Sequence, residues 1–176
     1  MLRKRKVGSV LMGQLLDLNG LKILVVEPDP DNRMLYTILL KDAGAEVLPT
    51  ASVPEALTVL AELTPDVVIS EIILPGEDGY SLIRQVKALE AQVQKQIPAI
   101  VISGSVQKDD PQVLKAGFQK CLLKPVNLNH LLRTIRRLVC DRLQSELEEQ
   151  KLTAILVPPR TKLVSHDNFY HFQSAM

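Results

Sequence analysis

Short apolar runs in this 176-residue chain end in polar side chains that could bind or react with a ligand. Residues 66–70 (DVVIS) are followed by the carboxylate of Glu71, and other apolar runs end at Glu27, Ser103 and Lys124. Short β-branched runs bounded by turn residues are typical of buried parallel strands. Open α/β sheets place their ligands and their chemistry at the carboxyl ends of such strands. The carboxylates, the hydroxyl and the ammonium group are therefore predicted to lie at one edge of a sheet.

Strands and helices are expected to alternate from residue 22 onward. The expected strands cover residues 22–26, 45–48, 66–70, 98–103 and 120–123. The expected helices cover residues 30–43, 52–63, 79–91 and 110–115, and a long last helix starts at Asn127. The first of these helices has its apolar positions at Met34, Leu35, Ile38 and Leu39 and ends at a Gly44 cap, and Ser52 is the N-cap of the next. Such alternation predicts an α/β fold with a mostly parallel sheet covered on both faces.

The composition is that of one domain with an aliphatic core. The chain has no Trp and only 3 Tyr and 3 Phe, and its net charge of +1 argues against nucleic acid or a membrane surface as the main partner. Cys121 and Cys140 are too few for a disulfide framework and lack zinc-ligand spacing, which indicates buried free thiols in a reducing cytosol. No run approaches the ~20 apolar residues of a spanning helix, and no secretory signal is expected. We expect a soluble, cytoplasmic protein.

The two ends of the chain differ from its middle. We expect an N-terminal extension, a central domain, and a C-terminal helix extension with a tail, at residues 1–20, 21–141 and 142–176. The basic run Arg3–Lys6 is expected to be a solvated terminus rather than a nucleic-acid contact. Leu143 and Leu147 continue the apolar stripe of the last helix. That stripe fits either a dimer seam or packing against the N-terminal segment.

The segments VVEPDPDNR, PDVVISEIILPGEDGY and AGFQKCLLKP carry a resemblance to a known family. Through them, residues 22 to about 140 resemble the receiver domain of bacterial two-component response regulators, the CheY-like domain. The resemblance implies a flavodoxin-like, doubly wound sheet of five parallel strands in the order 2-1-3-4-5. It also implies a pocket in which two acids after the first strand hold Mg²⁺. An aspartate after the third strand then accepts a phosphoryl group beside a hydroxyl and a lysine.

The residues that match this pocket depart from the family pattern at the nucleophile and at the metal. Glu71 stands at the position of the accepting aspartate, and Glu27 matches the first acid. Pro28 falls at the principal metal-binding acid and offers no side-chain oxygen, while Asp29 comes one residue late. The carboxylate of a glutamate lies ~1.5 Å further out, and a misplacement of about 1 Å can cost on the order of 100-fold in rate. We expect no useful phosphotransfer, no catalytic residues, and no cofactor beyond weakly held Mg²⁺, for which Glu27 and Asp29 are weak candidates.

The hydroxyl and lysine positions of the family pattern are retained. Ser103 matches the hydroxyl, and Lys124 followed by Pro125 matches the lysine–proline pair. In the family, an aromatic residue three positions before the lysine changes its position together with the hydroxyl group. Here that position is Cys121, so the aromatic ring of this pair is missing. The expected degenerate phosphoacceptor pocket consists of Glu27, Asp29, Glu71, Ser103 and Lys124.

The leading hypothesis is a stand-alone receiver-like signalling protein of a two-component (phosphorelay) pathway, acting through protein–protein interaction. Its expected partner is a sensor histidine kinase or another signalling protein, without direct nucleic-acid contact or membrane insertion. A homodimer through the last helix is a further hypothesis. The permanent charge of Glu71, paired with Lys124, would imitate the phosphorylated state. The alternatives are a phosphorylation-competent regulator with a weak Mg²⁺ site, a regulator of transcription through a partner, and a flavodoxin-like cofactor protein.

Overall fold

The computed structural model describes residues 17–104 and 111–156, and strands alternate with helices through them as the sequence predicts. The strands are β1 (Lys22–Val26), β2 (Glu46–Thr50), β3 (Val67–Ser70), β4 (Ala99–Ser103) and β5 (Lys120–Leu123). The helices are α2 (Pro30–Asp42), α3 (Val53–Glu62), α4 (Gly79–Val93), α5 (Pro111–Ala116) and α6 (Leu128–Leu156). The predicted start of the fourth helix at Asp110 lies outside the described residues.

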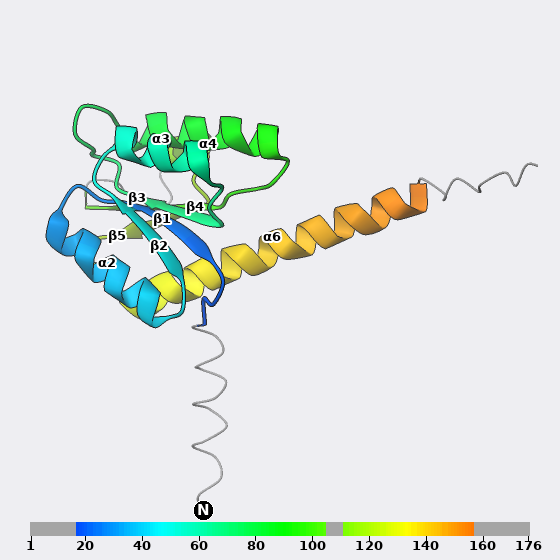
Figure 1. Cartoon of the computed structure of the whole chain (residues 1–176), viewed down its shortest axis with the longest axis horizontal. Helices are drawn as coiled ribbons and strands as arrows, with labels where there is room; N and C mark the ends of the chain where they lie inside the picture. The colour runs from blue at the N-terminus through cyan, green and yellow to red at the C-terminus, as the bar shows by residue number, and fades with distance from the viewer. Residues whose placement is uncertain (1–16, 105–110, 157–176) are drawn as a thin grey trace, which may run out of the picture.

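The strands form one parallel sheet in the order β2-β1-β3-β4-β5, which confirms the predicted flavodoxin-like arrangement (Figure 1). Val26 at the end of β1 is level with Thr50 on β2 and with Ser70 on β3. Ser103 at the end of β4 is level with Leu123 on β5. Because all strands run in the same direction, the residues that follow these positions emerge together at one edge of the sheet.

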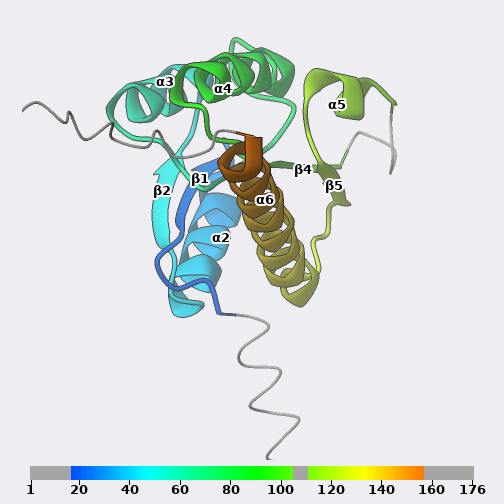
Figure 2. The ribbon, with the colours of Figure 1, turned by 90° about the vertical axis from the view of Figure 1, so that its right-hand side faces the viewer.

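Helices cover both faces of the sheet, and each face has its own apolar core. Figure 2 shows α2 and α6 on one side and α3, α4 and α5 on the other. Leu40 of α2 and Ile135 of α6 pack with Ile23 and Ile69, while Val86 of α4 packs on the opposite face. A strand buried on both faces needs apolar residues at successive positions, which explains the continuous apolar runs in the sequence.

Helix α2 turns most of its expected apolar stripe away from the sheet. Met34, Leu35 and Ile38 are 64%, 46% and 48% exposed, and the buried positions of this helix are instead Tyr36 and Leu40. The cause lies at the start of the helix, where Arg33 Nη1 donates to the carbonyl oxygens of Glu27 (2.6 Å) and Pro28 (3.0 Å). Positions 33, 36 and 40 share one side of a helix, so these bonds turn the side with Tyr36 inward.

The predicted helix ends are found where the sequence places them. Ser52 accepts a hydrogen bond from the backbone N–H of Glu55 at 3.4 Å and is the N-cap of α3. Gly44 follows α2 with a φ of +93°, a conformation that favours glycine, and its N–H donates to the carbonyl of Lys41 at 2.9 Å. A side chain at position 44 would also collide with Asn19.

A buried arginine anchors α6 at the edge of the sheet opposite the predicted pocket. Arg142 is 7% exposed, and its Nη1 donates to the carbonyl oxygen of Asp66 at 3.2 Å. Its Nη2 lies 3.4 Å from Asp66 Oδ1, which also accepts from Lys95 Nζ at 2.9 Å. Burial alone would raise the pKa of Asp66, but the backbone N–H of Lys22 and the cations Lys95 and Arg142 together lower it.

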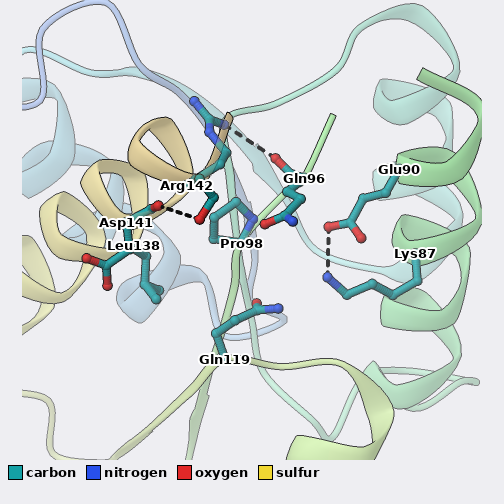
Figure 3. A pocket seen from close by; sticks show the side chains of 9 residues that line it. Lys87, Glu90, Gln96, Pro98, Gln119, Leu138, Asp141 and Arg142 are labelled. Atoms are coloured by element: carbon teal, nitrogen blue, oxygen red, sulfur yellow. Dashed lines mark hydrogen bonds and ion pairs between the residues drawn. The ribbon is translucent and has the colours of Figure 1, made fainter. Parts of the chain in front are cut away.

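A pocket of about 470 Å³ lies beside this anchor, between α4, α6 and the residues just before β4 and β5 (Figure 3). Polar groups in its lining bind one another and the ends of strands. Lys87 Nζ lies 2.7 Å from Glu90 Oε1, and that oxygen also accepts from the N–H of Ile97 at 2.6 Å. Gln119 Oε1 accepts from the N–H of Ala99 at 2.6 Å. These bonds join α4 to the segment before β4, and the residue before β5 to the start of β4.

Helix α6 continues beyond Arg142 and projects from the rest of the domain (Figure 1). Leu143, Leu147 and Leu152 are all exposed on this projecting part. None of the described helices combines the length and hydropathy needed to cross a membrane.

Candidate functional site

An ion triad forms where β1, β3 and β5 end. Lys124 follows β5, and its Nζ lies 2.8 Å from Oε2 of Glu27 and 2.8 Å from Oε2 of Glu71. The two carboxylate side chains are only 3% and 8% exposed, and the lysine side chain is 26% exposed. One cation thus serves two almost buried anions, which in its absence would repel each other.

The second oxygen of each carboxylate is bound to the backbone. Glu71 Oε1 accepts from the N–H groups of Ile72 at 2.8 Å and Ile73 at 3.4 Å. Glu27 Oε1 accepts from the N–H of Asp29 at 3.2 Å. Both oxygens of each carboxylate are therefore used within the protein, which fixes the direction in which each side chain points.

The two carboxylates also determine the direction in which the pKa of Lys124 is shifted. Burial by itself would lower the pKa of Lys124, because the charged form loses hydration. The hydrogen bonds to Glu27 and Glu71 and the charges of both act in the opposite direction and prevail, so the pKa of Lys124 lies above its ordinary value. The ammonium form is thus strongly favoured within the triad.

The loop after Glu71 is held by a close backbone approach at Gly79. A Cβ atom at position 79 would lie 2.5 Å from the carbonyl oxygen of Glu71 and 3.0 Å from Cα of Ile72. The N–H of Gly79 donates to the carbonyl of Ile72 at 2.7 Å, and Asp78 is the N-cap of α4. The Asp-Gly pair of the sequence motif thereby closes the loop onto the backbone of Glu71.

The side chain of Asp29 caps the start of α2 instead of joining the two glutamate side chains, although its backbone N–H donates to Glu27. Its Oδ1 accepts from the N–H of Asn32 at 2.8 Å, which makes Asp29 the N-cap of the helix. The residue is exposed. An oxygen that satisfies a free N–H group at a helix start has a structural use, so Asp29 does not join the triad.

Ser103 and Cys121 lie where the sequence predicts, on β4 and β5. Ser103 is fully buried, and its carbonyl oxygen accepts from the backbone N–H of Lys124 at 3.0 Å. This bond positions the lysine next to the end of β4. Cys121 is level with Val101 and half-buried, and it packs at the margin of the core under α4 and α5.

Tyr36 and Arg33 also belong to the surroundings of the triad, although neither was predicted from the sequence. Burial raises the pKa of Tyr36, the charge of Lys124 lowers it, and the charges of Glu27, Glu71 and Asp29 raise it again, with a net increase. Tyr36 therefore lies within the electrostatic reach of the triad. The spacing of Arg33, Tyr36 and Leu40 on one side of a helix was the available signal.

The donor set does not fit a magnesium ion. Mg²⁺ needs several oxygen ligands in near-octahedral geometry. Position 28 is a proline, and the oxygens of Glu27 and Glu71 are bound to Lys124 and to backbone N–H groups. Within residues 17–104 and 111–156, no group of three or more His, Cys, Asp or Glu side chains is arranged to hold a metal.

Comparisons with known proteins agree with the fold. A model of the response regulator receiver domain matches residues 23–136. An uncharacterized 14.6 kDa protein of Leptolyngbya boryana is 35% identical over 116 residues, which cover 65% of this chain and 87% of that protein. The hybrid signal transduction histidine kinase D of Dictyostelium discoideum is 32% identical over 129 residues, covering 69% of this chain but 8% of the kinase. The match therefore spans a small part of that relative.

Solved structures of receiver domains have the same fold. The chemotaxis response regulator CheY4 of Vibrio cholerae is 26% identical with a TM-score of 0.59, covering 66% of this chain and 97% of that one. A CheY-like receiver domain protein of Methanospirillum hungatei is 23% identical with a TM-score of 0.64, covering 70% and 97%, and shows the fold alone. The chain belongs to the response regulator receiver family. It is a receiver domain of two-component signalling with additional residues at both ends.

Proposed function

We propose that this receiver domain signals through protein–protein contacts, without phosphorylation of its own and without enzymatic activity. The observation that carries this proposal is the ion triad, in which Lys124 Nζ lies 2.8 Å from a carboxylate oxygen of both Glu27 and Glu71. The position that accepts phosphate in the family is thus occupied by a side chain already engaged with the lysine.

The geometry of Glu71 supports the loss of phosphotransfer. A nucleophilic oxygen must be free to meet the phosphorus, yet Oε2 is bound to Lys124 and Oε1 to two backbone N–H groups. In the family chemistry, the lysine would neutralise the transferred phosphoryl group. Here its charge is already shared between two carboxylates. The departure at Pro28 removes an oxygen that the metal would need.

The same triad supports a fixed signalling state. An anion at position 71 pairs with Lys124 at all times, whereas a phosphoryl group would come and go. A carboxylate carries less charge and fewer acceptor oxygens than a phosphoryl group. We propose that the pair holds the pocket in one state resembling the phosphorylated one, so that control is exerted by the amount of protein or by access to its partner.

The partner we propose is a sensor histidine kinase or another signalling protein of the same pathway. The matched regions of the curated relatives include parts of proteins named as histidine kinases, such as RcsC of Escherichia coli, 30% identical over 120 residues and covering 68% of this chain and 12% of RcsC. We also propose that the protein works in the cytoplasm, since both Cys121 and Cys140 are free thiols.

The division into parts is proposed as residues 1–20, 21–141 and 142–176, with the receiver domain in the middle. The projecting part of α6 is the element we propose for homodimer formation. Leu143 and Leu147 are four residues apart and both exposed, so they form a short apolar stripe along it. A second copy of the same helix would bury this stripe.

A phosphorylation-competent regulator is the second candidate function. The observation in its favour is that the backbones of Ser103 and Lys124 adjoin, with the backbone N–H of Lys124 bonded to the carbonyl oxygen of Ser103 at 3.0 Å. This candidate requires Lys124 to leave Glu71 when a phosphodonor arrives. The two functions make opposite predictions for magnesium-dependent chemistry.

The deciding experiment is amide NMR of the full chain during titration with Mg²⁺ and beryllofluoride. We expect no saturable shifts at Glu71, Ser103 or Lys124. The matched control is the double variant Pro28→Asp/Glu71→Asp, which restores both acids of the family pattern and should respond to both additions. Saturable, magnesium-dependent shifts in the unaltered chain would establish the second candidate and overturn the first.

A further inference from the structure

We propose that a pocket between α5, β5 and α6 binds a small organic phosphate. The phosphate group binds the cations of this pocket, and the apolar or aromatic body of the ligand packs on its apolar side chains. The pocket is separate from the ion triad, so its ligand goes beyond the proposed function and does not depend on whether Glu71 accepts phosphate.

The pocket lies at the end of the sheet where β5 is the last strand. Figure 2 shows β5 between α5 on one face and α6 on the other. Because β5 pairs with β4 alone among the described strands, its second edge has no strand beside it. The pocket has a volume of about 440 Å³. That volume lies within the roughly 300–1,000 Å³ of small-molecule sites.

The side chains in the lining that are charged at neutral pH are all positive. Lys120 belongs to β5, and Arg133 and Arg137 belong to α6. No Asp or Glu is among the described residues that line the pocket. Arg133 and Arg137 are four residues apart and therefore adjoin on one side of the helix. The chain as a whole has a net charge of only +1, so this is a local concentration of cations.

These cations have few partners within the protein. Lys120 and Arg133 are exposed, and within the described part of the chain neither forms a hydrogen bond or an ion pair through its side chain. Arg137 Nε lies 3.8 Å from Asp141 Oδ2, and both side chains are largely exposed. An exposed pair at this distance contributes little free energy. All three cations are therefore available to a ligand.

The rest of the lining offers an apolar surface next to the cations. Val113 and Leu122 are buried at 0% and 7% exposed, whereas Leu114 on α5 is 52% exposed. Solvated cations on a helix face are ordinary, but here they surround large apolar side chains. An apolar body laid on Leu114 would remove its surface from water, which is favourable. The lining thus fits an anion that has an apolar or aromatic part.

A phosphate group fits these donors better than a carboxylate does. It carries about −1.5 to −2 charge at pH 7 and three acceptor oxygens, so it can bind several cations at once. Guanidinium groups bind phosphate oxygens through two parallel N–H donors. The hydroxyl of Thr134, which also lines the pocket, already donates to the carbonyl oxygen of His130 at 2.8 Å. Recognition of the anion therefore depends on Lys120, Arg133 and Arg137.

The ligand would contact the strand that leads into the ion triad. Cys121 and Leu122 line the pocket, and Lys124 follows the same strand. A ligand that binds only the folded chain stabilises it by mass action. Occupation of the pocket would therefore stabilise β5 against unfolding from a side that the triad does not reach.

The test titrates the full chain with 1-naphthyl phosphate and, in parallel, with the neutral analogue 1-naphthalenemethanol. We expect saturable binding of the phosphate, at least about 10-fold tighter than that of the alcohol, because charge-assisted hydrogen bonds form with the phosphate alone. Naphthalene fluorescence measures the affinities. Amide NMR locates the probe, and we expect the largest shifts at Leu122 and Thr134.

The cations are tested by removing two of them. Lys120→Gln/Arg133→Gln should weaken binding of 1-naphthyl phosphate at least about 10-fold and leave binding of the alcohol unchanged. The matched control is Arg84→Gln/Lys151→Gln, which removes the same charge at exposed positions outside the pocket and should leave both affinities unchanged. Thermal unfolding shows that each variant is folded, since all four positions are exposed.

Four results would overturn the proposal. The first is no saturable binding of 1-naphthyl phosphate, and the second is equal affinity for the alcohol, which would leave the cations without a role. The third is unchanged affinity in Lys120→Gln/Arg133→Gln, which would place the phosphate elsewhere. The fourth is tighter binding of a peptide of alternating glutamate and leucine at the same amides. That result would make this face a docking surface for an acidic protein segment.

Discussion

Lys124 Nζ lies 2.8 Å from Oε2 of Glu71, although one residue follows β5 and the other follows β3. The same ammonium group lies equally close to Glu27 after β1. One cation therefore joins the ends of three strands that are not all neighbours in the sheet. The triad is at once part of the pocket and part of what holds the strand ends together.

Replacing Lys124 by methionine should destabilise the protein by about 3 kcal/mol, the lower end of the range for breaking a buried ion pair, because the lysine is partly exposed. The variant leaves two almost buried carboxylates without their cation. Urea unfolding measures the change, with Lys120→Met, at an exposed lysine on β5, the strand that Lys124 follows, as the control. Equal losses in both variants would mean that the triad adds no stability.

Alkaline pH should lower the free energy of unfolding because the same lysine loses its proton. The pKa of Lys124 is raised in the folded state above its ordinary value of 10.5, so the unfolded chain loses this proton first. The stabilisation is fully present below that pH and is lost as pH rises through the folded pKa. Urea unfolding between about pH 8 and about pH 11 should show a steeper decline for the natural chain than for Lys124→Met.

Tyr36 contributes in the same direction, because its pKa is also raised in the folded state, from an ordinary value of 10.0. Tyr36→Phe should therefore remove part of the alkaline decline, and the part that remains belongs to Lys124. A decline of the same slope in Lys124→Met and in the natural chain would contradict the assignment to the lysine.

Acid should lower the free energy of unfolding through Asp66, at the edge of the sheet opposite the triad. The pKa of Asp66 is lowered by the N–H of Lys22 and by the cations Lys95 and Arg142, which outweigh burial. Its contribution is present above the ordinary value of 3.8 and is lost as pH falls through the lower, folded value. Asp66→Asn should lose less stability than the natural chain below about pH 4. Asp42→Asn, at an exposed position on α2, is the control.

Gly79→Ala should destabilise the protein by about 1–3 kcal/mol, since the added carbon meets backbone atoms of Glu71 and Ile72 that cannot move aside cheaply. Gly104→Ala is the matched control, because a Cβ there would lie 3.9 Å from its nearest neighbour, Cβ of Lys124. Thermal unfolding compares the two variants. A tolerated alanine at position 79 would show that the loop after Glu71 adjusts freely.

The projecting part of α6 should govern self-association. Leu143→Ser/Leu147→Ser removes the apolar stripe from both copies and should weaken a dimer at least about 100-fold, given about 1.5–3 kcal/mol for each large side chain buried. Sedimentation equilibrium measures the change, with Leu114→Ser on α5 as the control. A natural chain that is monomeric at high concentration would refute the dimer.

The strands and the lysine–glutamate contact could be predicted because their signals are local. Each strand is a β-branched run bounded by turn residues, and the family pattern then placed Glu71 and Lys124 at strand ends that meet. The same family pattern placed Glu27 in this pocket, but as a weak metal candidate and not as a partner of Lys124. The direct contact between Glu27 and Lys124 was therefore not predicted.

Burial of polar residues and the rotation of helices were harder to predict. Arg142 looks like any charged residue on a long helix, and only its partner Asp66, which is distant in sequence, explains its burial. The apolar pattern of α2 was as compatible with a buried side formed by Met34, Leu35 and Ile38 as with one formed by Tyr36 and Leu40. The bonds from Arg33 to the carbonyls after β1 decide between the two sides, and they involve backbone atoms that no sequence pattern identifies.

Arg142 holds α6 at the sheet, and the helix extends freely beyond this point of attachment. The helix runs unbroken from the core residues Leu131 and Ile135 past the anchor to Leu156. Fourteen residues beyond Arg142 extend roughly 20 Å at 1.5 Å per residue. A tilt at the base of only a few degrees therefore moves the tip by more than an ångström. A partner bound at the tip would therefore be coupled through α6 to the contact between Arg142 and Asp66, at the edge of the sheet opposite the triad.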